Sequence, residues 1–152
     1  MSILREMSSI EFENYIDNAV KSYAKEKIES GNWTEDEAFY RSKSEYDKLL
    51  PNGVNSNNNY LFSILNEIDK VIGMIWLNVK ENNLGFIYDL NIYKEYQGKG
   101  YGLKAMKEIE NIAKSLKIEK IELHVFGHNI KAINLYEKLN YKKTNIIMSK
   151  KL

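Results

Sequence analysis

The feature that most constrains the fold is a glycine loop between an apolar strand pattern and a helical pattern. Residues 85–92 read as a strand, and the loop Gln97-Gly98-Lys99-Gly100-Tyr101-Gly102 follows shortly after it. Apolar residues at spacings of three and four then predict a helix from about residue 103. Three glycines in six residues let the backbone turn tightly and expose its N–H groups. With the positive end of the helix behind them, these groups predict a site for a phosphate or pyrophosphate.

Hydrophobic periodicity predicts the elements around that loop. A helical period predicts helices over 10–29 and 35–49, and from about 103 and 129 onward. Short runs bounded by turn residues predict strands over 3–7, 60–65, 71–79, 85–92, 120–126 and 141–150. This order predicts an α/β (α+β) fold, an antiparallel meander followed by a β-α-β crossover whose two strands run parallel. Ligands of such sheets bind at the carboxyl ends of the parallel strands, where the glycine loop and residues 127–129 lie.

The composition excludes several classes of protein. The 152 residues have the size of one domain, 1–152, and 43% of them are hydrophobic. The absence of cysteine excludes disulfides, thiolate metal sites and cysteine nucleophiles. No apolar run approaches the ~20 residues of a membrane span, and the first residues lack the pattern of a signal peptide. We therefore expect a cytoplasmic protein with no membrane partner.

The net charge of +1 conceals an asymmetry along the chain. Residues 1–97 hold 10 Lys and Arg against 16 Asp and Glu, whereas residues 98–152 hold 12 Lys against 5 Glu. The asymmetry fits a basic half that binds a polyanionic cofactor and an acidic half that binds a cationic substrate. Ordinary solvated lysines explain it about as well. The near-zero total argues against non-specific binding of nucleic acid.

Two common phosphate-binding patterns do not fit the loop, and a third does. The P-loop spacing and its hydroxyl are absent, and Gly-x-Gly-x-x-Gly would need glycine at position 103, which is leucine. Gln97-x-x-Gly100-x-Gly102 after a strand instead resembles the Gln/Arg-x-x-Gly-x-Gly/Ala signature of the GNAT N-acetyltransferase superfamily. Residues 129–141 resemble its second signature, Asn-x-x-Ala-x-x-Leu-Tyr-Glu-Lys-x-Gly-Phe/Tyr, with Asn140 in place of the glycine. Asparagine tolerates the left-handed backbone expected there best after glycine.

The resemblance covers residues 60–150 and implies a GNAT-like fold, with helices on both faces of a mixed, mostly antiparallel central sheet. It implies acetyl-CoA as cosubstrate and direct transfer of the acetyl group to a primary amine in a ternary complex. Strand 85–92 would splay from its neighbour, so that its free backbone groups bind the pantetheine as an added strand would. The resemblance assigns to the cofactor site Leu90, Asn91, Ile92, Gln97, Gly98, Lys99, Gly100, Tyr101, Gly102, Asn129 and Asn134.

The resemblance also implies catalytic residues. Tyr136 matches the tyrosine that protonates the leaving thiolate, whose pKa is about 8.5. The glutamate that many members use as a base has no counterpart, since Phe86 stands near its position. Asp89, Glu122 and His124 are the candidates that remain, and His124 titrates in a suitable range.

Alternation along strands makes two further predictions. It places Glu122, His124 and Phe126 on one face of the strand 120–126. It places Tyr88 and Asp89 on opposite faces of the strand 85–92, so that only one of them would face the substrate. The sequence leaves open which one does.

Several aspects of the partners also stay open. The acceptor is a small amine, a polyamine, or a peptide or protein amine, and Trp33 and residues 51–60 are expected to line its slot. His124 and His128 span a strand and a turn without a third ligand nearby in sequence, so we predict no metal. The alternative to an enzyme is a catalytically silent acetyl-CoA-binding sensor that acts through the helices of residues 8–49. A homodimer is compatible with either.

Overall fold

The computed structural model describes residues 2–152, and within this range it has five strands and four α-helices. The strands are β1 (Leu4–Glu6), β2 (Asn59–Leu65), β3 (Val71–Lys80), β4 (Leu84–Ile92) and β5 (Lys120–Leu123). The α-helices are α1 (Ser9–Glu29), α2 (Glu35–Leu49), α3 (Tyr101–Ser115) and α4 (Ile130–Lys138). Two short 3₁₀ helices, η1 (Gly53–Asn55) and η2 (Lys94–Tyr96), lie in the connections. None of the helices in residues 2–152 combines the length and the apolar character needed to cross a membrane.

The strands form one sheet in the order β1-β2-β3-β4-β5. The pairs β1–β2, β2–β3 and β3–β4 are antiparallel, whereas β4–β5 is parallel. This confirms the predicted meander, the edge strand at its start and the crossover through α3. The parallel pair is short, because only residues 84–87 of β4 pair with residues 120–123 of β5.

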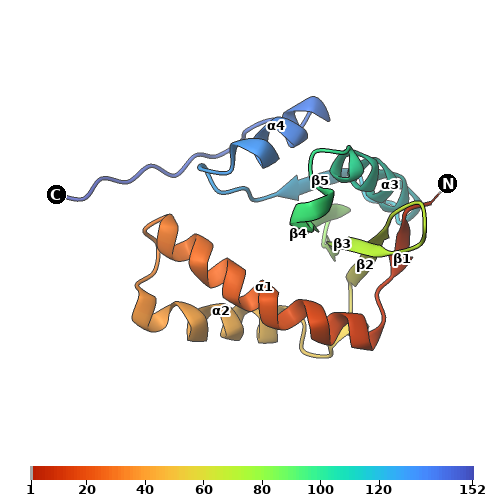
Figure 1. The fold of residues 1–152 in the computed structure, drawn as a ribbon. Helices are drawn as coiled ribbons and strands as arrows, with labels where there is room; N and C mark the ends of the chain where they lie inside the picture. Colours follow the sequence, from red (N-terminus) through yellow and green to blue (C-terminus); the bar gives the residue numbers. More distant parts are fainter. Residues whose placement is uncertain (1) are drawn as a thin grey trace.

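Helices cover both faces of the sheet, as expected (Figure 1). On one face α3 buries Ala105, Met106 and Ile109 against apolar residues of β2, β3 and β4, and α4 packs partly against the same cluster. On the other face α1 and α2 lie together and bury Tyr15 and Tyr46. Burial on both faces explains why β3 is apolar along most of its length rather than alternating.

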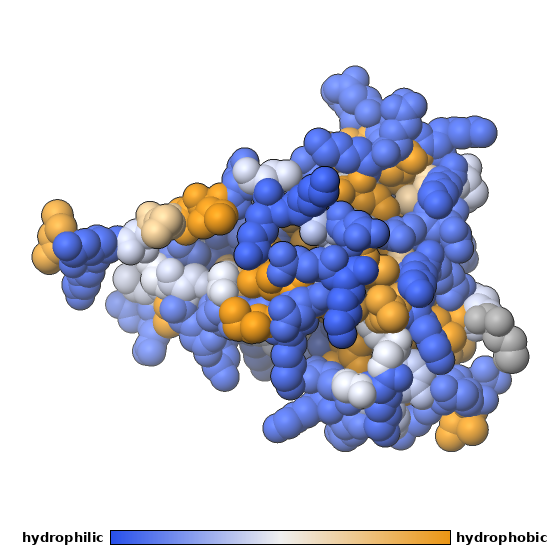
Figure 2. Space-filling view, turned by 90° about the horizontal axis from the view of Figure 1, so that it is seen from above, coloured by the Kyte–Doolittle hydropathy of each residue, from blue (hydrophilic) through white to orange (hydrophobic). Residues whose placement is uncertain are grey.

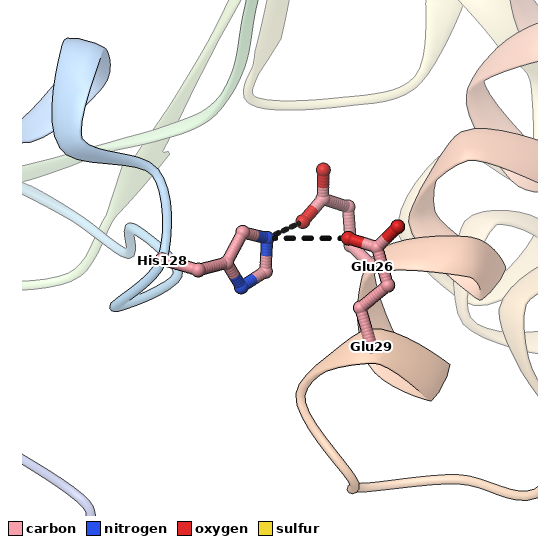
Figure 3. Close-up of side chains that lie close together, drawn as sticks. All are labelled: Glu26, Glu29 and His128. Carbon is pink, nitrogen blue, oxygen red and sulfur yellow. Dashed lines mark hydrogen bonds and ion pairs between the residues drawn. The ribbon is translucent and has the colours of Figure 1, made fainter.

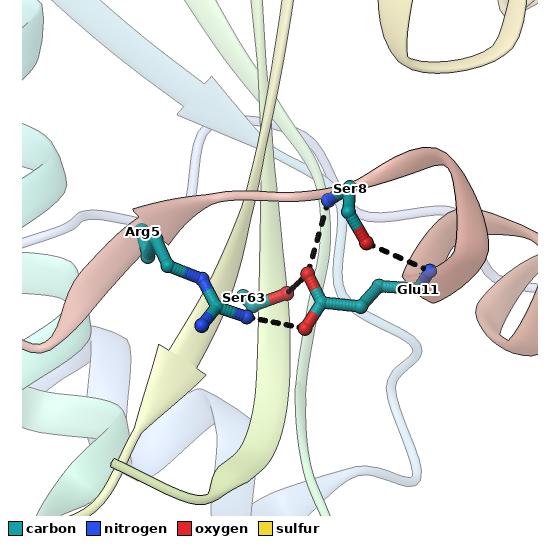
Figure 4. A network of polar contacts seen from close by, with 4 residues as sticks. All are labelled: Arg5, Ser8, Glu11 and Ser63. Atoms are coloured by element: carbon teal, nitrogen blue, oxygen red, sulfur yellow. Dashed lines mark hydrogen bonds and ion pairs between the residues drawn. The ribbon is translucent and has the colours of Figure 1, made fainter.

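The start of α1 is held by a polar network that joins three elements (Figure 4). Ser8 and Glu11 form a capping box, in which the Ser8 hydroxyl accepts from the Glu11 N–H and the Glu11 carboxylate accepts from the Ser8 N–H. The same carboxylate accepts from the Ser63 hydroxyl of β2 at 3.1 Å and pairs with Arg5 of β1. The network therefore fixes where α1 leaves the sheet edge.

The end of the chain differs from the sequence-based prediction. The strand predicted over 120–126 ends at Leu123, and no strand forms over 141–150. Asn140 does adopt the predicted left-handed conformation, with φ 69°. Beyond it, the N–H of Tyr141 bonds to the carbonyl of Tyr136, and residues 142–152 run away from the sheet as an exposed, extended segment (Figure 1). The apolar run at 146–148 favoured a strand in the sequence, but residues 142–152 pair with no strand among residues 2–152.

Candidate active site

The candidate site lies where β4 and β5 part. The last residues that pair are Ile87 and Leu123, and β4 continues to Ile92 without a partner on that side among the described residues. A groove of about 590 Å³ occupies the opening between residues 86–91 of β4, residues 124–126 after β5, and helices α1, α2 and α4. We call this the site groove. The splay that the resemblance implied is therefore a feature of this structure.

A β-bulge in β4 shapes the floor of the groove. Trp76 of β3 pairs with Asp89, but the next residue, Leu77, pairs with Ile87, so Tyr88 is the extra residue. The bulge breaks the alternation of side chains, and both Tyr88 and Asp89 line the groove. Tyr88 stacks on Trp76 with ring centroids 4.7 Å apart. The expectation that only one of Tyr88 and Asp89 faces the site is therefore wrong. It assumed that side chains alternate regularly along the strand, and the bulge interrupts that alternation.

Asp89 of β4 is one of the carboxylates that line the groove. The hydroxyl of Tyr15, from α1, donates to Asp89 Oδ2 at 2.7 Å. Burial raises the pKa of Asp89 above its usual range, while the hydrogen bonds from Tyr15 and from the Leu90 N–H lower it. Tyr46 of α2 also lines the groove, and burial together with the Asp89 charge raises its pKa well above the usual range. Asp89 therefore ionises less readily than an exposed aspartate and is a stronger base when ionised.

Tyr136 lines the same groove from α4. Burial, followed by the negative charge of Asp89, raises the pKa of Tyr136 to about 12. The phenol is therefore protonated throughout the physiological range, as a proton donor must be.

The other two base candidates lie apart from each other. Because β5 ends at Leu123, His124 and Phe126 turn into the site groove, whereas Glu122 lines a different groove on the outer side of β5. The predicted shared face of Glu122, His124 and Phe126 is therefore wrong. Glu122 is 3.5 Å from Lys120. The ring of His124 is exposed, and partial burial and the charge of Lys27 lower its pKa.

Trp33 and residues 51–60, which were expected to line the acceptor slot, are absent from the site groove. Trp33 is only 7% exposed and packs between α1 and α2 against Ala24 and Ala38. Other aromatic residues take that place. They come from α1, α2, β3, β4 and the segment after β4, and are Tyr15, Tyr23, Tyr46, Trp76, Phe86, Tyr88 and Tyr93.

The charge of the groove is one-sided. Glu26, Glu45 and Asp89 are among its lining residues, and within the described chain the lining contains no lysine or arginine. The acidic half of the sequence thus contributes its carboxylates to this cavity. A groove with aromatic walls and three carboxylates favours a cation over an anion.

The glycine loop lies beyond the end of β4. Gly98 and Gly100 have φ of 76° and 86°, in the left-handed region that favours glycine. A Cβ built on either would meet nothing within 4 Å, so both positions face open space. Within residues 2–152 the amides of 98–103 donate no backbone hydrogen bond, and α3 begins directly behind them. Free amides at a helix N-terminus fit a phosphate group.

The remaining cofactor-site residues have other visible contacts. The Gln97 side chain donates to the Ile92 carbonyl at 2.8 Å, which ties the loop to the end of β4. Gly102 leaves room for α4, because a Cβ there would lie 3.2 Å from the Leu135 side chain. Tyr101 is buried and donates to Glu67 at 2.6 Å.

Lys99 and two asparagines complete the predicted set. The Lys99 ammonium lies 5.9 Å from the Tyr96 ring centroid and is otherwise exposed. Asn129 lines the site groove and also caps α4, since its Oδ1 accepts from the Ala132 N–H at 3.2 Å. Asn134 is exposed on α4 and is not among the lining residues of the groove.

One cluster beside the groove was missed in the sequence. His128, in the turn before α4, lies 2.5 Å from Glu26 and 3.6 Å from Glu29 of α1 (Figure 3). These three residues offer ligand atoms within 4.8 Å of one another, and His124 is not part of the cluster. The contact joins two segments 102 residues apart along the chain, and no local pattern could have revealed it. It links α1 to the turn that carries Asn129.

Comparison with known proteins agrees with the geometry. A model of the acetyltransferase (GNAT) family matches residues 21–141. Two uncharacterized N-acetyltransferases of Bacillus subtilis, YdgE and YycN, are each 38% identical to this chain. The alignment covers 98% of this chain and 97% of YdgE, and 99% of this chain and 98% of YycN. The chain therefore belongs to the GNAT family and is an N-acetyltransferase, which is a class of acyltransferase.

Solved structures show the same fold. The crystal structure of B. subtilis YycN superposes with a TM-score of 0.94 at 36% identity, covering 98% of this chain and 97% of that one. The PaiA N-acetyltransferase of Thermoplasma acidophilum, solved in complex with coenzyme A, superposes with a TM-score of 0.68 at 26% identity. That comparison covers 91% of this chain and 89% of PaiA. Members of the family use acetyl-CoA, and the mixed sheet with four helices is the α+β GNAT fold.

Proposed function

We propose that this protein transfers the acetyl group of acetyl-CoA to a primary amine of a cationic acceptor, by direct attack in a ternary complex. The acceptor is a small amine, a polyamine, or a peptide or protein amine. The observation that carries the proposal is the site groove, where Asp89 and Tyr136 face one cavity whose charged lining is entirely acidic apart from His124. The proposal treats residues 1–152 as a single acyltransferase domain and places it in the cytoplasm, where acetyl-CoA is available.

The glycine loop is the proposed pyrophosphate site. Its free amides at 98–103 and its left-handed glycines suit a phosphate that approaches the backbone closely. The unpaired edge of β4, over Leu90, Asn91 and Ile92, is the proposed site for the pantetheine, which would add to the sheet like a strand. Acetyl-CoA bound in this way supplies an activated thioester at the centre of the groove.

Asp89 is the proposed general base. A protonated amine must lose a proton before its lone pair can attack a carbonyl carbon, and an ionised carboxylate in the groove can accept that proton. Because burial raises the pKa of Asp89, it is better matched to an amine than an exposed aspartate is. The hydroxyl of Tyr15 holds the carboxylate in place and keeps it ionised. His124, exposed at the edge of the groove, is the alternative base that substitution must exclude.

Tyr136 is the proposed general acid. When the C–S bond of the thioester breaks, the sulfur takes the bonding electrons and the Tyr136 phenol can give it a proton. The attacking nitrogen loses its second proton to solvent as the amide forms, and the phenolate of Tyr136 regains a proton from solvent. A pKa of about 12 keeps the phenol protonated between turnovers.

The charge and the aromatic walls of the groove indicate the acceptor class. Glu26 and Glu45 lie on α1 and α2, whereas Asp89 lies on β4, so an acceptor with more than one positive charge can pair with them while one amine reaches Asp89. Faces of Tyr and Trp rings attract ammonium groups by about 0.5–2 kcal/mol each. A polyamine or a lysine-containing peptide satisfies both features, whereas an acidic acceptor does not.

Calorimetry and a thiol-release assay test the proposal. Acetyl-CoA should bind the wild-type chain, and Gly100→Asp should abolish binding, because a carboxylate would repel the phosphate and strain the left-handed backbone. Gly31→Asp, at another left-handed glycine far from the loop, controls for general loss of stability. Thiol release should then appear with spermidine or a lysine peptide and not with acidic amines such as glutamate. Tight binding of acetyl-CoA without turnover on any amine would favour the silent sensor instead.

A further inference from the structure

Three side chains beside the site groove offer metal ligands from two separate elements. Glu26 and Glu29 lie near the end of α1, and His128 lies in the turn before α4 (Figure 3). The Nε2 atom of His128 is 2.5 Å from a carboxylate oxygen of Glu26 and 3.6 Å from one of Glu29. One imidazole nitrogen and two carboxylates therefore converge on one small region.

The separations suit a tetrahedral metal ion. Zn²⁺ binds imidazole nitrogen and carboxylate oxygen at about 2.0–2.2 Å, so that two of its ligand atoms lie about 3.3–3.6 Å apart. The 3.6 Å between His128 Nε2 and the Glu29 oxygen is in this range. The 2.5 Å to the Glu26 oxygen is shorter, and rotation about the side-chain bonds of Glu26 can lengthen it, since that side chain is 37% exposed.

The cluster carries more negative charge than its neighbours balance. Among the described residues, neither Glu26 nor Glu29 is paired with a lysine or an arginine. Lys27, which lies between them in sequence, is placed over the rings of Tyr23 and Trp33, 5.6 and 5.2 Å from their centroids. A single N–H of an imidazole satisfies one carboxylate at a time. A divalent cation pairs with both carboxylates and accepts the imidazole lone pair as well.

Each side of the cluster is positioned by its own element. Glu26 and Glu29 are three residues apart on a helix, so their side chains leave the same face of α1. The imidazole of His128 stacks on Phe126, with ring centroids 5.7 Å apart and planes 18° apart. The N–H of Asn129 closes the turn by donating to the Phe126 carbonyl at 2.9 Å. The ligands are thus held near their positions by packing and by the backbone, which favours binding.

An ion can reach the cluster from water. The side chains of His128 and Glu29 are 41% and 49% exposed. Hydrophilic side chains predominate on the face of the molecule that carries α4 (Figure 2). The exposure leaves space for a water ligand, as in zinc sites that have three protein ligands and one open position.

We propose that His128, Glu26 and Glu29 bind one divalent transition-metal ion, for which Zn²⁺ is the best match. The imidazole ligand favours zinc over Mg²⁺ and Ca²⁺, which prefer oxygen ligands. Glu26 and Asn129, the neighbour of His128, both line the site groove. The bound ion therefore joins the α1 wall of the groove to the turn that leads into α4.

This site differs from the pair of histidines considered in the sequence. That prediction of no metal rested on the lack of a third ligand near His124 and His128 in sequence, whereas the cluster combines His128 with carboxylates of α1. Glu26 and His128 are 102 residues apart in the chain. The proposal depends neither on the acetyl acceptor nor on the catalytic residues.

Calorimetric titration with Zn²⁺ is the first test, on the full chain purified without a histidine tag. The wild type should bind one Zn²⁺ per chain. His128→Asn, Glu26→Gln and Glu29→Gln should each weaken binding by at least about 10-fold, because each removes one of three ligands. His124→Gln, at the other histidine, and Glu13→Gln, at an exposed glutamate of α1, are matched controls that should bind like the wild type. A wild type without saturable binding, or a His128→Asn variant with unchanged affinity, would overturn the proposal.

Thermal unfolding is the second test, because an ion that joins two elements of the folded chain stabilises it. Zn²⁺ at about 100 times its dissociation constant should raise the melting temperature of the wild type by about 5–10 °C, and that of His128→Asn by much less. Mg²⁺ in the same excess should neither raise the melting temperature nor displace Zn²⁺. If Mg²⁺ displaces Zn²⁺, or if Zn²⁺ stabilises His128→Asn as much as the wild type, the imidazole is not a ligand and the proposal fails.

Discussion

Two grooves flank β5, and they are open for different physical reasons. The site groove opens because β4 and β5 diverge after Ile87 and Leu123, so the backbone itself makes the space. Its lining combines carboxylates with tyrosines whose hydroxyls are held by hydrogen bonds or burial. The second groove runs along the outer edge of β5, and we call it the outer groove. It opens because no strand among the described residues pairs with that edge, and Ile118, Ile121 and Leu139 give it an apolar lining.

The two grooves therefore suit different functions. A cavity with buried, perturbed titratable groups is suited to proton transfer, whereas an apolar slot along a sheet edge is suited to backbone pairing. Each groove also contains a carboxylate and a tyrosine. These matched residues, Asp89 with Glu122 and Tyr136 with Tyr141, allow the assignment to be tested one pair at a time.

The largest difference is expected for the carboxylates. Asp89→Asn should lower kcat/KM for an amine by about 100-fold or more, because the base is lost while the shape is kept. Glu122→Gln in the outer groove should leave kcat/KM within about 2-fold, as expected for an exposed surface pair. Steady-state thiol release measures both. If His124→Gln lowers turnover and Asp89→Asn does not, His124 is the base and the proposal for Asp89 fails.

The tyrosines should differ next. Tyr136→Phe should lower kcat by about 10-fold to 100-fold, less than the loss of the base, since a thiolate with a pKa of about 8.5 leaves without much help. The affinity for acetyl-CoA, measured by calorimetry, should stay near normal. Tyr141→Phe removes a hydroxyl that donates to Glu110 at 2.7 Å outside the site groove, and it should keep kcat. Equal losses in the two variants would remove Tyr136 from the role of acid.

A smaller effect, visible as a shift along the pH axis, is expected for Tyr15→Phe. The Tyr15 hydroxyl lowers the pKa of Asp89 against the effect of burial, so its removal should raise that pKa further. Because the base must be ionised, activity falls as pH drops through the pKa of Asp89. The acidic limb of the kcat/KM profile should therefore move to higher pH in Tyr15→Phe. A profile with an unmoved acidic limb would separate Tyr15 from the base.

The smallest effect is expected for the network at the start of α1, which lies outside both grooves. Partial burial raises the pKa of Glu11, but the Ser8 N–H, the Ser63 hydroxyl and the Arg5 charge outweigh it, so the net pKa is lowered. A lowered pKa in the folded state adds stability above the unfolded pKa of about 4.3, and this stability is lost as pH falls through the folded value.

Glu11→Gln should therefore lower the free energy of unfolding by about 1 kcal/mol at neutral pH, and by less in acid. Denaturant unfolding at several pH values measures this difference. Turnover per folded molecule should not change. Glu37→Gln, at the equivalent position of the more exposed cap of α2, should lower the free energy of unfolding by less at neutral pH.

Patterns among residues that are neighbours in sequence predicted most of the helices and strands. The helices α1 and α2, the hairpin β2–β3 and the parallel pair β4–β5 follow from periodicity, caps and turn residues, because these are properties of neighbouring residues. The backbone at Asn140 was predictable for the same reason. The glycine loop was recognisable because its conformation depends on residue type.

The details of the site depended on contacts that local pattern does not contain. The bulge at Tyr88 depends on how β4 pairs with β3. Regular alternation along β4 alone therefore predicted the wrong set of side chains for the groove. The proximity of His128 to Glu26 arises only after folding. The segment predicted as a strand over 141–150 has a strand's composition, but a strand forms only where a segment pairs with a neighbour, and among the described residues this segment pairs with none.

The free inner edge of β4 has a consequence for the exchange of amide hydrogens. Residues 88–92 are bonded to β3 on one side only, so amides that point into the site groove are open to solvent. Their hydrogens should exchange with deuterated water faster than those of β3, which is paired on both sides. The amides at 98–103 should behave likewise. A ligand that spans the groove would slow exchange in these two stretches together, although five residues lie between them.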